Sequence, residues 1–581
     1  MSIDKVQSNY EIAKIEADKT DLKIIETLCT KKSFRVEAGA GSGKTYSLNK
    51  VIEWLQDNRW REFNIKKQRV ICITYTNVAV DVITSRLKPN SFIEPSTIHS
   101  FAWNAMKQYQ STLVRLVGEN NLLPEDVDIK NVSYVTYSLG VRYVDGTTLH
   151  LFHNDVIMLF SLMLDNAKFR NIFSKMYPLI LIDEYQDSFK VIIDKFLSYF
   201  IQNDTGPQFG FFGDSWQTIY QLNNVCGLIN DEKIVVIPKG SNFRSAPKIV
   251  NFLNQLRPDL PQLSAIDDYE GEIIAIHSND YTGVRNTDRF FKNDLPFQIL
   301  EERLTTVKNH FRKAVMQPEE KLKILMLTHR LLAAQQGYSN LLNLLDDAFK
   351  NEKDEILTFF MSTIEPIFEA LKSNNTQLLF ESLGVRSYPI NTKAQKQEWS
   401  ALRDKLEIAR NGVVSDVLNI AIKSKLIPIP SAVSEINKNM TVAPDTPYRN
   451  GTISNLANLT YNEFVNGIEF LRPSAIYSTD HGVKGEEYDN VLFVIGRGWN
   501  HYNFEKYIPM NPANVSVDDQ NAYERNRNLF YVCCSRPKKR LVLFITTPFE
   551  GNFKAYIEYL VGKDSVFSFS EYIKIGKQIL I

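Results

Sequence analysis

The chain has 581 residues, of which 44% are hydrophobic and 23% charged, and 67 basic side chains balance 67 acidic ones. This length exceeds what one hydrophobic core holds and predicts about three to five domains of ordinary globular composition. The zero net charge excludes binding of nucleic acid through a global positive field, so any such partner requires a local basic groove.

The cysteine spacing and the lengths of the apolar runs favour a cytoplasmic protein. The chain has no C-x-x-C spacing, which argues against a zinc site or a disulfide framework and favours reduced thiols. No apolar run approaches the length of a membrane helix, and the polar start MSIDKVQSNY does not resemble a signal peptide. We therefore expect a cytoplasmic protein with no membrane partner.

Short, continuous apolar runs predict buried strands along the whole chain. They are RVICITYT (69–76), LILID (179–183), FGFFGD (209–214), KIVVIP (233–238), LKILMLT (322–328), NVLFVIG (490–496) and RLVLFIT (540–546). Uninterrupted hydrophobicity is typical of parallel strands that are covered on both faces. Segments of helical period separate these runs, so the predicted class is α/β with two doubly wound units.

Two intervals lack this alternation of strand and helix. Residues 102–174 and about 331–471 are mostly of helical pattern, and the second also contains proline-rich turns. We interpret both intervals as mainly helical insertions, one in each α/β unit.

A glycine-rich stretch follows the first predicted strand, FRVEAG, and precedes the predicted helix KTYSLNKVIEWLQ. Its residues form a Walker A pattern with alanine at the first glycine position: Ala38, Gly39, Ala40, Gly41, Ser42, Gly43, Lys44 and Thr45. The backbone N–H groups of such a loop, with the helix N-terminus behind them, bind a triphosphate. We expect Lys44 to reach the β- and γ-phosphates of ATP and Thr45 to ligate Mg²⁺.

A second carboxylate site follows the strand LILID in the sequence LILIDEYQDS. Asp183 ends the strand and is predicted to hold Mg²⁺, directly or through water. Glu184 is predicted to activate the attacking water as general base. An Asp-Glu pair at a strand end is a weak signal alone and a strong one beside a Walker A loop.

Further motifs occur in a fixed order: TYTN (74–77), STIHSF (96–101), IDEYQDS (182–188), GDSWQTIY (213–220), NFRS (242–245), STDHGVKGEEYDNV (478–491) and NLFYVCCSRPKKRL (528–541). Together with the Walker A loop, they resemble superfamily 1 DNA helicases of the UvrD/Rep/PcrA type. The resemblance covers most of the chain and implies a motor that moves 3′→5′ on single-stranded DNA.

The resemblance also implies four subdomains. Residues 1–101 and 175–240 would form RecA-like lobe 1A with both Walker motifs, and residues 102–174 its helical insertion 1B. Residues 241–335 and 472–581 would form RecA-like lobe 2A, and residues 336–471 the mainly helical insertion 2B.

Roles at the nucleotide follow from the matched positions. Gln217 would sense the γ-phosphate, and Arg244 and Arg536 would neutralise transition-state charge across a cleft, an effect worth roughly 10³–10⁵ in rate. Phe243 would pack on adenine. Glu487 would contact the ribose, although a plain solvated glutamate stays an open alternative.

Roles at DNA follow in the same way. Tyr75 and Tyr220 match base-stacking positions, where each base is worth about 1–3 kcal/mol. The expected backbone contacts are Thr74, Asn77, His99 and Thr479, and His481 matches a coupling position.

Three departures from the family pattern affect these expectations. Lys23 stands near the place of the glutamine that reads adenine, and Tyr46 is an alternative stacking partner for the base. Residues 221–224 lack the usual aromatic ring and cation, although Trp216 is an added ring. The family's GLEF segment is GEEY at 485–488, which predicts a weaker grip on the strand.

The leading hypothesis is an ATP-dependent helicase or translocase that acts on single-stranded or junction DNA, in DNA repair or anti-phage defence. The alternative is a DNA-sensing regulatory ATPase subunit that acts with a separate nuclease partner and unwinds little by itself. A P-loop signalling GTPase does not account for the second lobe and its arginines.

Overall fold

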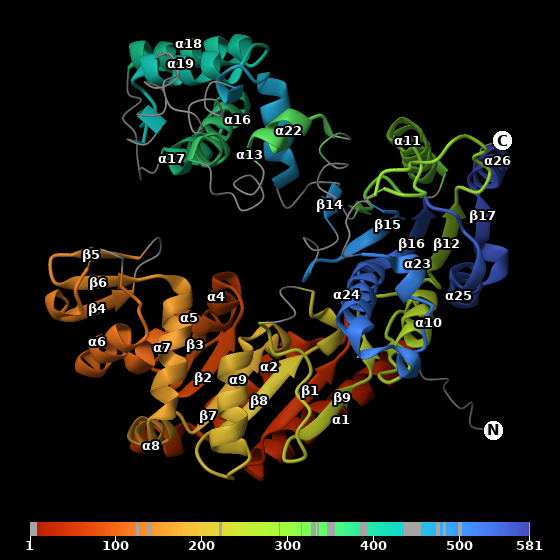
Figure 1. Cartoon of the computed structure of the whole chain (residues 1–581). Helices are drawn as coiled ribbons and strands as arrows, with labels where there is room; N and C mark the ends of the chain where they lie inside the picture. Colours follow the sequence, from red (N-terminus) through yellow and green to blue (C-terminus); the bar gives the residue numbers. More distant parts are fainter. Residues whose placement is uncertain are drawn as a thin grey trace, which may run out of the picture. The chain divides into compact units, whose positions relative to one another are not determined.

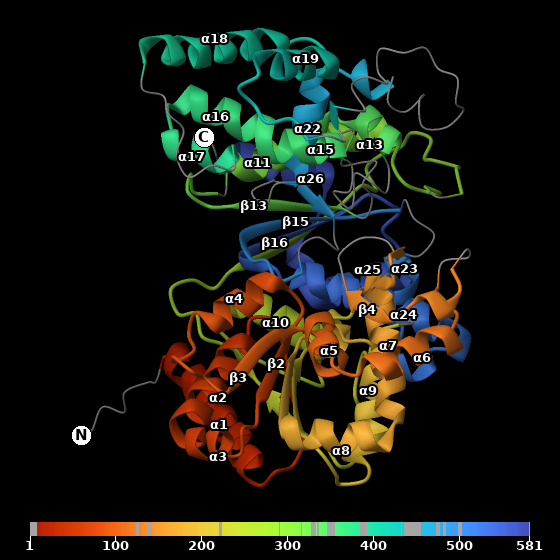
Figure 2. The ribbon, with the colours of Figure 1, turned by 90° about the vertical axis from the view of Figure 1, so that its left-hand side faces the viewer.

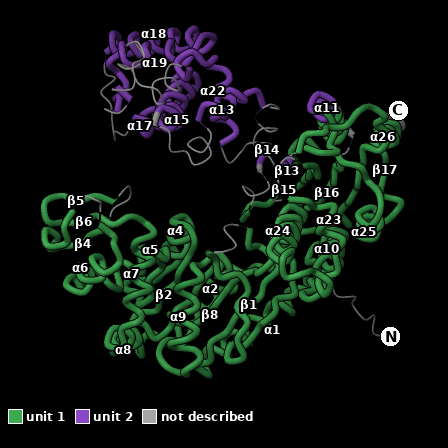
Figure 3. The backbone as a smooth tube through the Cα atoms, viewed as in Figure 1, with its two compact units in different colours: residues 1–296, 303–322, 480–581 green, residues 297–302, 323–479 purple. Residues whose placement is uncertain are grey.

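The structure is a computed structural model that describes residues 8–123, 127–137, 142–219, 224–289, 291–314, 316–326, 333, 336–345, 355–383, 392–430, 433–434, 455–471, 477–479, 484–497 and 502–579. Its chain forms two compact units (Figure 3). Unit 1 holds residues 1–296, 303–322 and 480–581, and unit 2 holds residues 297–302 and 323–479.

The first sheet of unit 1 is six-stranded and parallel, in the order β3-β2-β7-β8-β1-β9 (Figure 1). Its strands, in sheet order, are Ile93–Thr97, Val70–Thr74, Leu179–Asp183, Gln208–Gly213, Phe34–Ala38 and Val235–Lys239. The four strands β1, β2, β7 and β8 are buried almost throughout. The continuous apolar runs of β2, β7 and β8 predict this burial.

Helices cover both faces of this sheet (Figure 2). One face packs against α1 (Asn9–Cys29), α2 (Lys44–Asn58) and α3 (Trp60–Ile65). The other packs against α5 (Ile98–Met106), α7 (His153–Asp165), α8 (Ala167–Met176) and α9 (Lys190–Phe196). The arrangement is the doubly wound α/β layering that the sequence predicts.

The predicted first insertion contains α6 (Gln110–Glu119), most of α5, α7 and α8, and a small sheet. That sheet has the order β4-β6-β5, with strands Tyr134–Tyr137, Thr148–Leu151 and Tyr143–Asp145. The sequence pattern did not predict these three short strands, because they are half-exposed and contain several polar residues.

A second parallel sheet in unit 1 contains β15 (Tyr488–Ile495), β16 (Pro537–Ile545), β12 (Glu272–His277) and β17 (Val566–Ser568), adjacent in that order. Around it lie α10 (Pro247–Leu256), α11 (Phe297–Ala314), α24 (Val517–Cys534), α25 (Gly551–Val561) and α26 (Phe569–Ile579), with the short α23 (Phe504–Tyr507). Two short strands, β10 (Ser241–Asn242) and β11 (Leu263–Ser264), precede it. The fold is mixed α/β with two parallel sheets.

Unit 2 is mainly helical. It contains strands β13 (Leu322–Met326) and β14 (Tyr477–Thr479), which pair in parallel, and the helices α13 (Ser339–Leu345), α15 (Glu355–Phe359), α16 (Glu365–Ser373), α17 (Thr376–Ser382), α18 (Lys393–Ala409), α19 (Val414–Ser424) and α22 (Tyr461–Leu471). Beside its apolar core lies the buried Glu365, which accepts hydrogen bonds from Tyr461 and Arg410. The helical pattern predicted for this interval is confirmed in the described segments.

Candidate nucleotide site

The Walker A loop connects β1 to α2. Gly41 and Gly43 have φ angles of 76° and 77°, a left-handed conformation in which a side chain is strained. A Cβ on Gly41 would also lie 2.7 Å from Asn242 Oδ1, so the loop needs glycine there for space as well. Two residues distant in the chain contact the loop. Phe243, directly after β10, donates from its N to Gly41 O at 2.8 Å, and Ala40 N donates to the hydroxyl of Tyr531 on α24 at 3.1 Å.

Three predicted catalytic side chains meet at the carboxyl ends of β1 and β7. Lys44 Nζ forms an ion pair with Glu184 Oε1 at 2.7 Å, and Glu184 N donates to Asp183 Oδ1 at 3.0 Å. Gln186 Nε2 donates to Glu184 Oε2 at 2.5 Å. The structure therefore brings Lys44, Asp183 and Glu184 together, while their catalytic roles stay predictions.

The backbone at Glu184 is strained. Its φ and ψ are 50° and 44°, in the left-handed region that a residue with a Cβ adopts only at a cost of about 1–3 kcal/mol. The hydrogen bond from its N–H to Asp183 and the one between its carboxylate and Gln186 hold it there. This conformation directs the carboxylate toward Lys44.

The charges of this cluster alter one another's pKa. Burial lowers the pKa of Lys44, but the Glu184 and Asp183 carboxylates raise it more, so the ammonium stays charged. Burial, with the Glu184 charge added, raises the pKa of Asp183. Burial also acts to raise the pKa of Glu184, yet Lys44 and Lys484 lower it overall, so Glu184 is a carboxylate at neutral pH.

Residues from the second half of unit 1 reach the same cluster. Lys484 Nζ donates to Asp187 Oδ2 and, at 2.7 Å, to the backbone O of Gln217. Arg536 is only 1% exposed, and its Nη2 donates to Gln217 Oε1 at 3.4 Å. Gln217 Nε2 in turn donates to Asp214 Oδ2 at 2.8 Å.

The two predicted arginines lie close together. Arg244 Nη1 donates to Ser535 O at 3.1 Å, next to Arg536 in the chain. Burial and then the Arg244 charge lower the pKa of Arg536 to about 10, so two cations are held near each other against their repulsion. Such a pair is suited to binding an anion with several negative charges.

Glu487, the predicted ribose contact, pairs with cations in this structure. It accepts from Arg244 Nε at 3.1 Å and forms an ion pair with Lys538 Nζ at 2.6 Å. Its ribose role stays a prediction.

Exposed rings lie beside the glycine loop. Tyr46 is exposed, with Lys50 Nζ 4.9 Å from its ring centroid, and Phe243 is exposed with Tyr10 packed edge-on at 6.3 Å. Phe243 and Tyr46 both lie within 4 Å of the position of a Cβ on Gly43. Lys23 is an exposed residue in the middle of α1. The two rings could therefore hold a nucleobase next to the loop.

The residues predicted to hold Mg²⁺ offer only oxygen donors. Thr45 is exposed at the first turn of α2, and Asp183 is buried at the end of β7. Among the described residues no three His, Cys, Asp or Glu side chains are grouped as a metal site. A hydroxyl and one carboxylate suit Mg²⁺, which takes its other ligands from water and phosphate.

The predicted DNA contacts are only partly described. Thr74 donates to Thr76 O, Tyr75 is 60% exposed, and Asn77 begins α4 (Asn77–Thr84). Tyr220, His481 and the side chain of Thr479 lie outside the described residues, as do the departures at 221–223.

Two other rings are engaged with protein. The His99 ring stacks on His153 with centroids 3.5 Å apart and meets Phe189 edge-on. Trp216 lies between the guanidinium of Arg527, 4.1 Å from its centroid, and the ring of Tyr531.

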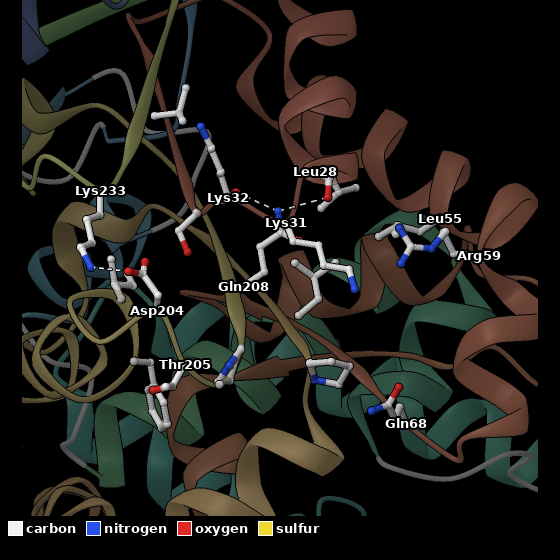
Figure 4. A pocket seen from close by; sticks show the side chains of 18 of the residues that line it. Leu28, Lys31, Lys32, Leu55, Arg59, Gln68, Asp204, Thr205, Gln208 and Lys233 are labelled. Atoms are coloured by element: carbon white, nitrogen blue, oxygen red, sulfur yellow. Dashed lines mark hydrogen bonds and ion pairs between the residues drawn. The ribbon is translucent and has the colours of Figure 1, made fainter.

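A cavity of about 680 Å³ lies at the opposite, amino-terminal edge of the first sheet (Figure 4). Its labelled side chains include Lys31, Lys32, Arg59 and Lys233, with Gln208 hydrogen-bonded to backbone carbonyls of the α1–β1 connection. None of the predicted site residues lines it.

The sequence prediction missed a set of buried charges around the site: Glu37, Asp214 and Arg257. Arg257 donates to both carboxylates. A signal was available, since Arg35 and Glu37 interrupt an otherwise apolar strand, and buried charges are rare unless they are paired.

The fold and the glycine loop are similar to those of P-loop domains, and the comparisons with known proteins point the same way. Residues 21–223 match the family model of an AAA domain. Among curated proteins, the chain is 23% identical over 689 aligned residues to Gabija protein GajB of Bacillus cereus (strain HuB5-5), a match that covers 93% of this chain and 97% of that protein. No described helix is both long and apolar enough to cross a bilayer.

Replacement of Glu184 by glutamine removes the predicted base and keeps the shape of the side chain. We expect the Glu184→Gln variant to bind ATP with an affinity close to that of the wild type while kcat falls by about 10²–10⁴, the range for general bases. Steady-state hydrolysis and nucleotide titration measure the two quantities. Wild-type turnover in Glu184→Gln would assign the base to another residue. The companion variant is Lys44→Ala, which we expect to fold and to hydrolyse no ATP.

Protonation of His99 predicts a pH dependence of stability. Burial and then the neighbouring His153 lower the pKa of His99 to about 4, whereas an unfolded histidine titrates near 6.5. The unfolded chain takes up this proton first, so the stability present above pH 6.5 is lost as pH falls toward 4. Between pH 7 and pH 4.5, the Tm of His99→Gln should fall less than the Tm of the wild type. Equal falls in Tm would contradict a contribution of His99 to the pH dependence of stability.

Proposed function

We propose that this protein is an ATP-dependent DNA translocase or helicase that moves 3′→5′ on single-stranded DNA, in DNA repair or anti-phage defence. The observation that carries the proposal is the cluster of Lys44, Asp183 and Glu184 beside the glycine loop. Two arginines from another part of the chain lie near it, Arg244 next to Gly41 of the loop and Arg536 on Gln217. The AAA-domain match supports nucleotide use. The match to Gabija protein GajB, over nearly the full length of both chains, supports a role shared with that protein.

The geometry supports a division of labour in hydrolysis. The glycine loop and Lys44 would bind the phosphates, and Mg²⁺ held by Thr45 and Asp183 would offset phosphate charge. Glu184 would accept a proton from the attacking water. Arg536 and Arg244 would neutralise charge that develops in the transition state.

Movement on DNA requires that the nucleotide site and the DNA contacts be connected, and Gln217 supports that connection. Its side chain contacts Arg536 and Asp214, its backbone carbonyl accepts from Lys484, and Thr218 O next to it accepts from Asn528. A change at the phosphates would therefore pass directly to segments that also carry predicted DNA-contacting residues.

A second candidate function is a DNA-sensing regulatory ATPase subunit that works with a separate nuclease. The sequence at 221–224 favours it, because a ring and a cation that grip the strand in the family are replaced. The position of Trp216 supports it further, since that ring is packed between Arg527 and Tyr531 instead of standing exposed for a base.

Strand displacement by the purified chain separates the two candidates. A helicase should convert a duplex with a 3′ single-stranded tail to single strands in an ATP-dependent way and leave a 5′-tailed duplex intact. DNA-stimulated ATP hydrolysis without displacement would favour the regulatory subunit. Unwinding of the 5′-tailed duplex instead would contradict the proposed direction.

Tyr75 provides the sharpest test of the DNA track. Replacement by alanine should cost about 1–3 kcal/mol of single-strand affinity if the ring stacks on a base. The salt dependence of binding should not change, because stacking releases no counterions. Fluorescence anisotropy at several salt concentrations measures both.

The matched control is Tyr559→Ala, which removes a ring that is equally exposed, at 62%, on α25. It should leave affinity unchanged. Equal losses in both variants, or none in Tyr75→Ala, would reject Tyr75 as a stacking residue.

A further inference from the structure

Arg257 joins two buried carboxylates of the first sheet. It directly follows α10, which packs against β12 and β16 of the second sheet, and it is 2% exposed. Its Nη2 donates to Glu37 Oε1 at 2.7 Å and its Nη1 donates to Asp214 Oδ1. The guanidinium also lies 5.2 Å from the ring centroid of Trp216. A planar fork that binds two carboxylates at once is a role that only arginine fills among the cationic side chains.

Asp214 connects Arg257 to residues of the candidate nucleotide site. One of its oxygens, Oδ1, accepts from Arg257, while the other, Oδ2, accepts from Gln217 Nε2 at 2.8 Å and from the Tyr531 hydroxyl at 3.3 Å. The Tyr531 hydroxyl in turn accepts from Ala40 N of the glycine loop. With Oδ1 held by Arg257, the carboxylate cannot rotate, and the orientation of the Gln217 amide is fixed.

Glu37 connects the same guanidinium to the predicted base. Its Oε1 accepts from Ser215 N at 3.0 Å and Ser215 Oγ at 2.7 Å, and its Oε2 accepts from the Tyr185 hydroxyl at 2.8 Å. Tyr185 directly follows Glu184, whose backbone is held in the left-handed region. One carboxylate therefore touches the segment of the base, the segment of Gln217 and Arg257.

We propose that Arg257, anchored by Glu37, is a positioning residue for ATP hydrolysis that acts on the γ-phosphate sensor Gln217 through Asp214. Arg257 lies outside every motif recognised in the sequence, and both of its terminal nitrogens are bound to carboxylates instead of being aimed at the glycine loop. The inference rests on the proposed ATPase function and adds a connection from the second sheet to its sensor.

A double-mutant cycle tests the connection. The Arg257→Lys variant keeps the charge but cannot bind both carboxylates in the forked geometry. With saturating single-stranded DNA, kcat should fall at least about tenfold while KM for ATP changes less than about threefold. In a Gln217→Ala background, the same change should lower kcat by less than about twofold, because the group through which it acts is gone.

The control is Arg142→Lys, which alters another arginine that binds a buried carboxylate, Asp155, through two nitrogens in the first insertion. Its kcat should stay within about twofold of the wild type. Near-UV circular dichroism shows whether each variant is folded. If Arg257→Lys does not fold, Glu37→Gln replaces it in the cycle, because it weakens the hydrogen bond between Arg257 and Glu37.

The outcomes separate the two proposals. The positioning role would be overturned if Arg257→Lys lowered kcat by the same factor in the Gln217→Ala background as in the wild type. An unchanged kcat in folded Arg257→Lys would also overturn it. A wild-type protein that hydrolyses no ATP with or without DNA would instead reject the proposed function itself.

Discussion

The structure around the glycine loop depends on one buried guanidinium held between two buried carboxylates. Moving a charge out of water costs several kcal/mol, which is recovered only if the partners are close and all remaining donors and acceptors are satisfied. The carboxylates meet that condition, since Asp214 accepts from Arg257 and Glu37 accepts from Arg257, Ser215 and Tyr185. On the cation, Arg257 Nε has no hydrogen-bond partner among the described residues and lies 3.6 Å from Asp259 Oδ2. Removal of one member of such a group typically destabilises a protein by about 3–5 kcal/mol, so the geometry of these segments is tightly fixed.

A rigid connection of this kind gives the catalytic residues a common frame. Lys44 and Glu184 belong to segments that follow strands of the first sheet, whereas Arg536 and Lys484 come from segments around the second. Lys44 and Glu184 follow parallel strands of the first sheet and therefore lie at its carboxyl edge, whereas Lys484 and Arg536 precede β15 and β16 of the second sheet. If both sets of residues act in hydrolysis, as proposed, the reaction would couple the two halves of unit 1.

The sequence predicted the local part of this picture well. The strands β2, β7, β8, β9, β13, β15 and β16 follow continuous apolar runs, and β1 was predicted from its place before the glycine loop. The clustering of Lys44, Asp183 and Glu184 follows from two motifs with strand-end positions. Strands β3 and β12 were missed. The former, IEPST, is mostly polar, and the latter, EIIAIH, is a short run with a charged residue at one end and a histidine at the other.

The non-local contacts were beyond sequence reasoning. Arg257 lies 220 residues from Glu37 and 43 from Asp214, and no spacing rule relates them. The packing of Trp216 between Arg527 and Tyr531 depends likewise on where α24 lies against the first sheet. Glu487 illustrates the same point, since its pairing with Arg244 and Lys538 depends on three segments that are distant along the chain.

A crystal structure with Mg²⁺ and a non-hydrolysable ATP analogue tests the central claim most directly. The account predicts the triphosphate on the glycine loop, with Lys44, Arg244 and Arg536 on the γ-phosphate and the metal on Thr45 and Asp183. The nucleobase should lie beside Phe243 and Tyr46. Nucleotide bound elsewhere, for example in the lysine-lined cavity at the amino-terminal edge of the first sheet, would contradict the account.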